Sequence, residues 1–218
     1  VELPDQFASF FSSKITNLRS SISETSTSTD NFPSVHEPTI NFDSDSLSHF
    51  SPATVQEITD LIRASPNKQC CLDPIPTLLL KSCVQCLSPT ITQIINLSFS
   101  NGIFPDSLKK AIVSPLLKKS SLDRDTLSNY RPISNLSFLS KLLERIVLKR
   151  LNTYLSSNSL FNKHQSAYTK NHSTETVLLS VHNTIISAMS TQRLTGLCLL
   201  DLSSAFDTID HSILIDRL

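Results

Sequence analysis

Apolar residues recur at helical spacing along most of this chain. Side chains three and four positions apart share one face of a helix, and such stripes run through residues 7–22, 55–62, 73–102, 138–158 and 174–189. Ser51 and Pro52 fit the start of the second helix, Ser88 and Pro89 a break in the third stretch, and Gly102 its end. Ser173 fits the N-cap of the last helix, at residues 174–189. The pattern predicts a helix-rich α+β chain.

Three stretches follow an extended pattern instead. Residues 111–119 and 130–137 predict two short strands joined by a long basic loop, and residues 194–201 (LTGLCLLD) predict a short buried strand. Periodicity alone does not separate the last from a buried helical turn; Thr195, Gly196 and the acid that follows favour a strand. A carboxylate at the exit of a buried strand is unfavourable unless something binds it. Asp201 is therefore a first indication of a metal site.

The composition changes along the chain and divides it into three parts. We expect an acidic, Ser/Thr-rich linker with one helix in residues 1–46, a helical extension in residues 47–110, and a part that contains the strands in residues 111–218. The sequence begins at Val1 and stops inside an apparent helix. We therefore expect it to be a piece of a longer protein.

Charge is segregated although the formal net charge is zero. Residues 1–66 hold nine acidic side chains against three basic ones, whereas residues 104–175 hold twelve basic side chains against five acidic ones. A basic surface suits a phosphate backbone. Solvated lysines on helix faces are the alternative, and charge alone does not separate the two.

Other features bound the class of protein. Five cysteines form no disulfide-like framework, which favours a reducing compartment. The sequence shows no apolar run of about 20 residues and no signal peptide, which predicts an intracellular protein without a membrane partner, nuclear or cytoplasmic. Cys83 and Cys86 form a C-x-x-C pair, for which a role as buried thiols is favoured over a zinc site. The sequence contains two glycines, which are too few for a phosphate-binding loop.

Asp201, followed by LSSAFD, has the arrangement that two-metal phosphoryl transfer requires: a fixed carboxylate with open space beyond it for ions and phosphate. A cap on the following helix is the alternative role of this aspartate. Neighbouring motifs favour the metal. NYRPISNLSFLSKLLERIVLKRL, HQSAYTKNHSTETVLL and LLDLSSAFDTIDHSIL occur in this order, and together they resemble the reverse transcriptase of LINE-type non-LTR retrotransposons.

The resemblance covers residues 70–218 and implies the fingers and the start of the palm of a right-hand polymerase, incomplete. Asp201 matches the first catalytic aspartate, a ligand of two Mg²⁺ ions, with the Leu202 carbonyl assisting. Arg131 matches the arginine that contacts the incoming triphosphate, which its planar fork suits. Lys118 matches a basic residue on the preceding strand, and a small shift of register exchanges it with Lys119.

Two aromatic residues also match the family. Phe206 matches the gate that excludes a ribose 2′-OH, although it also fits an anchor for the helix after the strand. Tyr168 fits either stacking on a template base or packing inside the fingers. Many relatives have arginine where this chain has Thr169, so Lys170 is the nearest cation there. Asp207 and Asp210 are expected to order the helix start rather than bind metal.

The implied parent enzyme is an RNA-directed DNA polymerase that copies retrotransposon RNA from a DNA primer with dNTPs. The Tyr-X-Asp-Asp motif that completes its metal site and the thumb are not in this sequence, so we expect the chain alone to be inactive. Two other interpretations stay open: a nucleic-acid-binding module without catalysis, and an inert retroelement remnant. The sequence predicts no oligomeric state.

Overall fold

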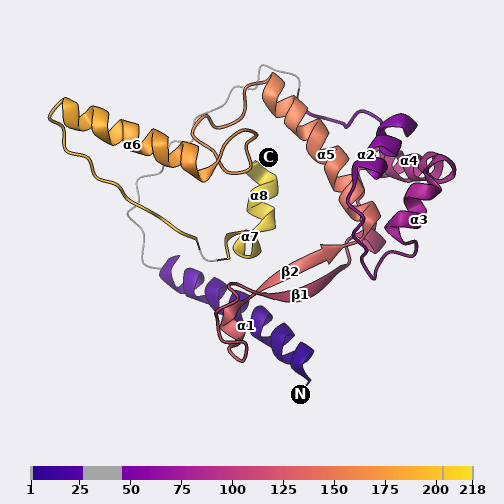
Figure 1. The fold of residues 1–218 in the computed structure, drawn as a ribbon, viewed down its shortest axis with the longest axis horizontal. Helices are drawn as coiled ribbons and strands as arrows, with labels where there is room; N and C mark the ends of the chain where they lie inside the picture. Colours follow the sequence, from indigo (N-terminus) through magenta and orange to yellow (C-terminus); the bar gives the residue numbers. More distant parts are fainter. Residues whose placement is uncertain (1, 27–45, 203, 218) are drawn as a thin grey trace.

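The structure is a computed structural model that describes residues 2–26, 46–202 and 204–217. It is helix-rich with one two-stranded antiparallel sheet, which confirms the predicted α+β class (Figure 1). The middle of the predicted linker, residues 27–45, lies outside the described residues. In chain order the elements are α1 (Leu3–Ser26), α2 (Val55–Ala64), α3 (Thr77–Ser82), α4 (Val84–Asn101), the 3₁₀ turn η1 (Asp106–Leu108), β1 (Ala111–Leu117), the 3₁₀ turn η2 (Leu127–Asn129), β2 (Tyr130–Leu136), α5 (Phe138–Ser157), α6 (Thr174–Ser190), α7 (Ala205–Thr208) and α8 (His211–Arg217).

One hydrophobic core joins α2, α3 and α4 to the first half of α5. Apolar stripes on these helices meet there, and the buried members are Ala53, Ile58, Ile62, Leu80, Val84, Ile91, Ile95, Leu142, Leu143 and Ile146. The start of α5 therefore shares its core with the helices that precede the sheet. This core holds the sheet through the short connection from β2 into α5 (Figure 1).

Helix α2 begins three residues later than the sequence pattern predicts. Its N-cap is Thr54, whose side chain accepts a hydrogen bond from the Glu57 N–H at 3.1 Å. The predicted cap fails because the backbone before Thr54 is hydrogen-bonded to another helix. Asn96 of α4 accepts from the Ala53 N–H at 2.7 Å and donates to the Ala53 carbonyl at 3.0 Å, so this backbone is committed outside the helix.

Helix α4 continues through Pro89, and the predicted break there is wrong. Proline removes one backbone donor, but Ile91 and Ile95, which follow Pro89 along the helix, are buried in the core. Ser88 is buried as well, and its hydroxyl donates to the Val84 carbonyl at 2.7 Å. Packing of the apolar face outweighs the local signal. The predicted end is confirmed, because Gly102 caps the helix with φ 63°.

The sheet and the helix after it form as the sequence predicts. β1 and β2 pair antiparallel with Ala111 opposite Leu136. Ser137 then caps α5, and its side chain accepts from the Ser140 N–H. The expected cap of α6 is also present, because Ser173 and Thr176 exchange hydrogen bonds in a capping box.

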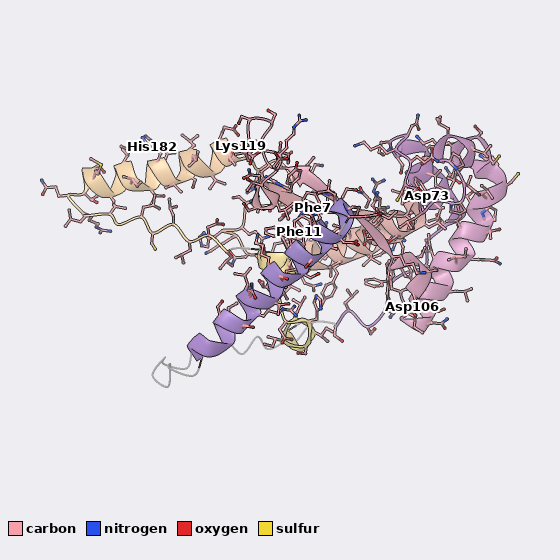
Figure 2. The ribbon with its side chains drawn as sticks, turned by 90° about the horizontal axis from the view of Figure 1, so that it is seen from below. Phe7, Phe11, Asp73, Asp106, Lys119 and His182 are labelled. Atoms are coloured by element: carbon pink, nitrogen blue, oxygen red, sulfur yellow. The ribbon has the colours of Figure 1, made fainter. Side chains whose placement is uncertain are left out.

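Helices α1 and α6 contribute no residue to this core. α1 crosses the hairpin, whereas α6 projects away from the molecule in both views (Figures 1 and 2), and none of its residues is buried. No helix among the described residues is long and apolar enough to cross a membrane.

The cysteines are not buried thiols. Cys71, Cys83, Cys86 and Cys198 are exposed, Cys70 is half-buried, and all five are free. The prediction fails for Cys83 and Cys86 because the buried face of this region is formed by Leu80, Val84 and Ile91.

Candidate nucleotide and nucleic-acid site

The β1–β2 hairpin brings the two predicted triphosphate contacts to one face of the sheet. Leu116 lies opposite Arg131, and the pairing continues one step further, since the Lys118 N–H donates to the Asn129 carbonyl at 2.9 Å. Side chains alternate between the faces of a strand, so Lys118 and Arg131 lie diagonally on the same face. The Lys118 ammonium donates to the Ser128 carbonyl at 2.7 Å, and Arg131 is exposed.

The loop between the strands is ordered by an acidic residue. Asp123 accepts hydrogen bonds from the Thr126 hydroxyl at 2.5 Å and the Asp125 N–H at 3.1 Å. The Thr126 hydrogen bond is the main cause that lowers the pKa of Asp123. Lys119 is exposed next to this loop. The loop therefore presents cations from a fixed backbone.

Helix α5 does not offer all of its cations to a ligand. Arg150 donates to the two carboxylate oxygens of Glu57 at 2.9 and 2.6 Å, and Lys149 donates to one of them at 2.7 Å. Hydrogen bonds from Arg150 and then Lys149 lower the pKa of Glu57 from 4.5 to about 2. These two cations of the basic stretch tie α5 to α2, so their role is structural.

The predicted strand at residues 194–201 is wrong. These residues have no regular secondary structure, and Leu200 is 90% exposed. A strand needs a hydrogen-bonded neighbour, and the sheet of the described residues contains only β1 and β2, which pair with each other. Asp201 is accordingly exposed and not at the end of a strand. It does not cap the following helix either, since Ser204 is the N-cap of α7.

The two predicted aromatic residues contact each other. The rings of Tyr168 and Phe206 meet edge to face with centroids 6.5 Å apart. Both are largely exposed, Tyr168 at 91% and Phe206 at 74%, so neither is an internal packing residue. Lys170, two residues after Tyr168, is exposed as well. Sequence reasoning named each residue and missed their contact, which joins segments 38 positions apart.

Helix α1 touches the neighbours of two site residues, which the sequence did not reveal. Phe7 packs edge to face on Tyr130 with ring centroids 4.9 Å apart, directly before Arg131. Twelve residues later, Arg19 donates to the Asp207 carbonyl at 3.3 Å, directly after Phe206. Figure 2 shows Phe7 and Phe11 on α1 where it crosses the hairpin. The only signal for this contact is the apolar stripe that begins at Phe7.

Asp210 behaves as a helix-start residue, and Asp207 lies in the first turn of α7. Asp210 accepts from the Ser212 hydroxyl, and at 2.9 and 3.3 Å from the Ser212 and Ile213 amides. These hydrogen bonds, that of the hydroxyl first, lower the pKa of Asp210. His211 begins α8, as predicted. No three His, Cys, Asp or Glu side chains gather into a possible metal site in the described part of the chain, so these residues alone do not fit the two ions.

The comparisons with known proteins concern the family of the chain, on which its sequence bears directly. Residues 116–218 match the family described as "Reverse transcriptase (RNA-dependent DNA polymerase)". The RNA-directed DNA polymerase from mobile element jockey of Drosophila funebris is 30% identical over 167 residues, which cover 73% of this chain and 18% of that protein. Residues 116–218 thus match the reverse transcriptase family.

Two further relatives extend the similarity beyond residues 116–218. The probable RNA-directed DNA polymerase from transposon BS of Drosophila melanogaster is 28% identical over 76% of this chain and 18% of its own length. The transposon TX1 uncharacterized 149 kDa protein of Xenopus laevis is 31% identical over 77% of this chain and 13% of its own length. This reverse transcriptase segment thus spans less than a fifth of the relatives that it matches.

Proposed function

We propose that the chain supplies the fingers and the first palm carboxylate of an RNA-directed DNA polymerase, which copies retrotransposon RNA from a DNA primer with dNTPs. The observation that carries the proposal is the placement of Lys118 and Arg131 on one face of an antiparallel hairpin within the segment that matches reverse transcriptases. The Arg131 guanidinium donates two parallel hydrogen bonds to phosphate oxygens. Lys118 and Lys119 add positive charge beside it.

In this proposal Phe206 is the steric gate and Tyr168 supports it. Their edge-to-face contact holds the exposed Phe206 ring, so that it clashes with a ribose 2′-OH. Tyr168 and Lys170 face the nucleic acid. Asp201 and the Leu202 carbonyl are the metal ligands of the complete polymerase, with two Mg²⁺ ions as its cofactor. Because the described residues gather no cation site of their own, we propose that the chain by itself does not polymerise.

Primer extension tests the catalytic part of the proposal. Purified chain is incubated with an RNA template, an annealed DNA primer, dNTPs and Mg²⁺, and a complete relative serves as the positive control. The expected result is no extension, since one carboxylate cannot hold two cations in catalytic geometry. Extension by the chain that is lost in Asp201→Asn contradicts the proposed inactivity.

Nucleic-acid binding without catalysis is the second candidate function. It is favoured by the exposure of Lys119, Arg131 and Lys170, because exposed cations suffice for phosphate contacts. RNA binding without primer extension, both by this chain and by a longer protein that contains it, distinguishes this candidate from the polymerase.

A further inference from the structure

A cavity of about 460 Å³ lies between the residues after α2, the open end of the hairpin and the start of α5. Its volume lies within the range of small-molecule sites. Three basic side chains line it, Lys68, Lys141 and Arg145, against one acidic side chain, Asp73. Asp73 lies at this end of the molecule, on the far side from α6 (Figure 2). The charged lining therefore has an excess of two positive charges.

The acidic side chain is already engaged by the protein backbone. One Asp73 carboxylate oxygen accepts from the Phe138 N–H at 2.6 Å, and the other from the Cys70 N–H at 3.1 Å. Asp73 thus binds the first N–H of α5, where the helix dipole also favours a negative charge. Its interactions are with these amides and not with the basic side chains of the cavity.

The basic side chains that line the cavity lack, among the described residues, the acidic partner that the other two cations of α5 have. Lys149 and Arg150 are neutralised by Glu57, whereas none of Lys68, Lys141 and Arg145 forms an ion pair with a residue in the described ranges. Arg145 donates one hydrogen bond, to the Ser65 hydroxyl at 2.9 Å, which orients its guanidinium. The two cations of α5 that form no ion pair with a described residue, Lys141 and Arg145, therefore both lie at the cavity.

The cavity also shares a face with the candidate nucleotide site. Ser114 and Asn135 form part of its wall, and Asn135 is on the same face of the hairpin as Arg131 because the two lie four positions apart on β2. That separation is about 13 Å along a strand. A phosphate-bearing chain that contacts Arg131 can reach the cavity along this face.

We propose that the cavity binds a phosphate group, carried by a nucleic-acid strand or by a free nucleotide. For the strand the inference rests on the proposed function; for the free nucleotide it does not. Lys68 and Lys141 attract the phosphate as point charges, and the oriented Arg145 guanidinium donates hydrogen bonds to its oxygens. No covalent step is involved.

Cysteine alkylation provides a local readout of occupancy. Cys70 and Cys71 line the cavity, whereas the exposed Cys86 and Cys198 do not. The full chain is treated with N-ethylmaleimide, which is uncharged, and mass spectrometry gives the rate at each cysteine. Single-stranded RNA, dNTP and inorganic pyrophosphate are added in separate arms at equal phosphate concentration. We expect at least about a threefold slower reaction at Cys71 in one or more arms, with Cys86 and Cys198 unchanged.

Paired variants separate the cavity from general electrostatics. Lys68→Gln with Lys141→Gln removes two cavity charges, and neither ammonium group donates a hydrogen bond to another described residue. Lys14→Gln with Lys163→Gln removes two exposed charges elsewhere. The first pair is expected to abolish protection of Cys71, and the second to leave it unchanged.

The outcomes distinguish the two proposals. Protection by RNA alone assigns the phosphate to a strand, and protection by dNTP or pyrophosphate assigns it to a free nucleotide; both support the site. Protection in no arm, or equal loss in both variant pairs, overturns it. If the chain does not bind RNA in a filter assay but pyrophosphate protects Cys71, the proposed function fails while the anion site stands.

Discussion

At the scale of single residues, the ion pairs of Glu57 show how charge is used for stability. Its carboxylate joins α2 to Arg150 and Lys149 of α5, and the side chains of Glu57 and Arg150 are 14% and 15% exposed. An ion pair that is largely screened from water, with hydrogen bonds to both oxygens, contributes more than a surface pair. Lys149 and Arg150 of α5 thus stabilise the fold.

We predict that Glu57→Gln lowers the free energy of unfolding by about 2 kcal/mol at pH 7, the range of a hydrogen bond to a charged group. The folded-state pKa of Glu57 is lowered from 4.5 to about 2. Its contribution is therefore complete above about pH 4.5 and is lost as the pH falls toward about 2. Urea unfolding across this range measures the effect, with exposed Glu144→Gln as control. A wild-type advantage that persists unchanged at pH 2 contradicts it.

A second residue-level prediction compares two aspartates. Asp201 is exposed and caps no helix, so Asp201→Asn is expected to change the free energy of unfolding by less than about 0.5 kcal/mol. Asp73 holds two backbone amides, so Asp73→Asn is expected to cost about 2 kcal/mol. Chemical denaturation measures both. A loss above about 1 kcal/mol for Asp201→Asn would restore a structural role for this residue.

At the scale of elements, α1 links the hairpin to the helix after Asp201. Phe7 is only 9% exposed, although it lies within the predicted linker of residues 1–46, and its contact with Tyr130 joins the first helix to β2. Arg19 reaches α7 from the same helix. The helix rises about 18 Å between these two residues, so it can hold two parts of the site at a fixed separation.

We therefore predict that Phe7→Ala lowers the free energy of unfolding by about 2 kcal/mol, less than the 3–5 kcal/mol of a phenylalanine enclosed in a core. Hydrogen exchange at the β2 amides is expected to accelerate with it. Leu3→Ala is the control, because Leu3 lies on the same helix and is 61% exposed. Equal effects of the two substitutions would show that α1 does not pack on the hairpin.

The elements also show where sequence reasoning succeeds. The hairpin, α5 and the capped α6 depend on local signals, so they could be predicted from the pattern. The continuation of α4 through Pro89 and the start of α2 at Val55 could not be predicted in this way, because the core around Ile91 and the hydrogen bonds of Asn96 decide them. The segment at residues 194–201 fails for a different reason: its pattern fits a strand, but the described chain offers it no strand to pair with.

At the scale of the whole molecule, a neutral chain separates its cations by role. Lys149 and Arg150 are paired within the helical half, while Lys119, Arg131 and Lys170 are exposed around the hairpin and the segment after α5. The spacing of Lys118 and Arg131 could be predicted from the motifs. Their shared face follows only from the register of the sheet.

The most direct test of this account is the salt dependence of RNA binding. Fluorescently labelled single-stranded RNA is titrated with the chain from low to moderate salt. The logarithm of the association constant is expected to fall linearly with the logarithm of the salt concentration, with a slope of about −0.7 per phosphate contacted. Lys118→Ala with Arg131→Ala should weaken binding about tenfold and flatten the slope, whereas Lys14→Ala with Lys163→Ala should change it less than about twofold. An affinity that is independent of salt, or equal losses in the two variant pairs, would contradict the assignment of the hairpin to nucleic-acid binding.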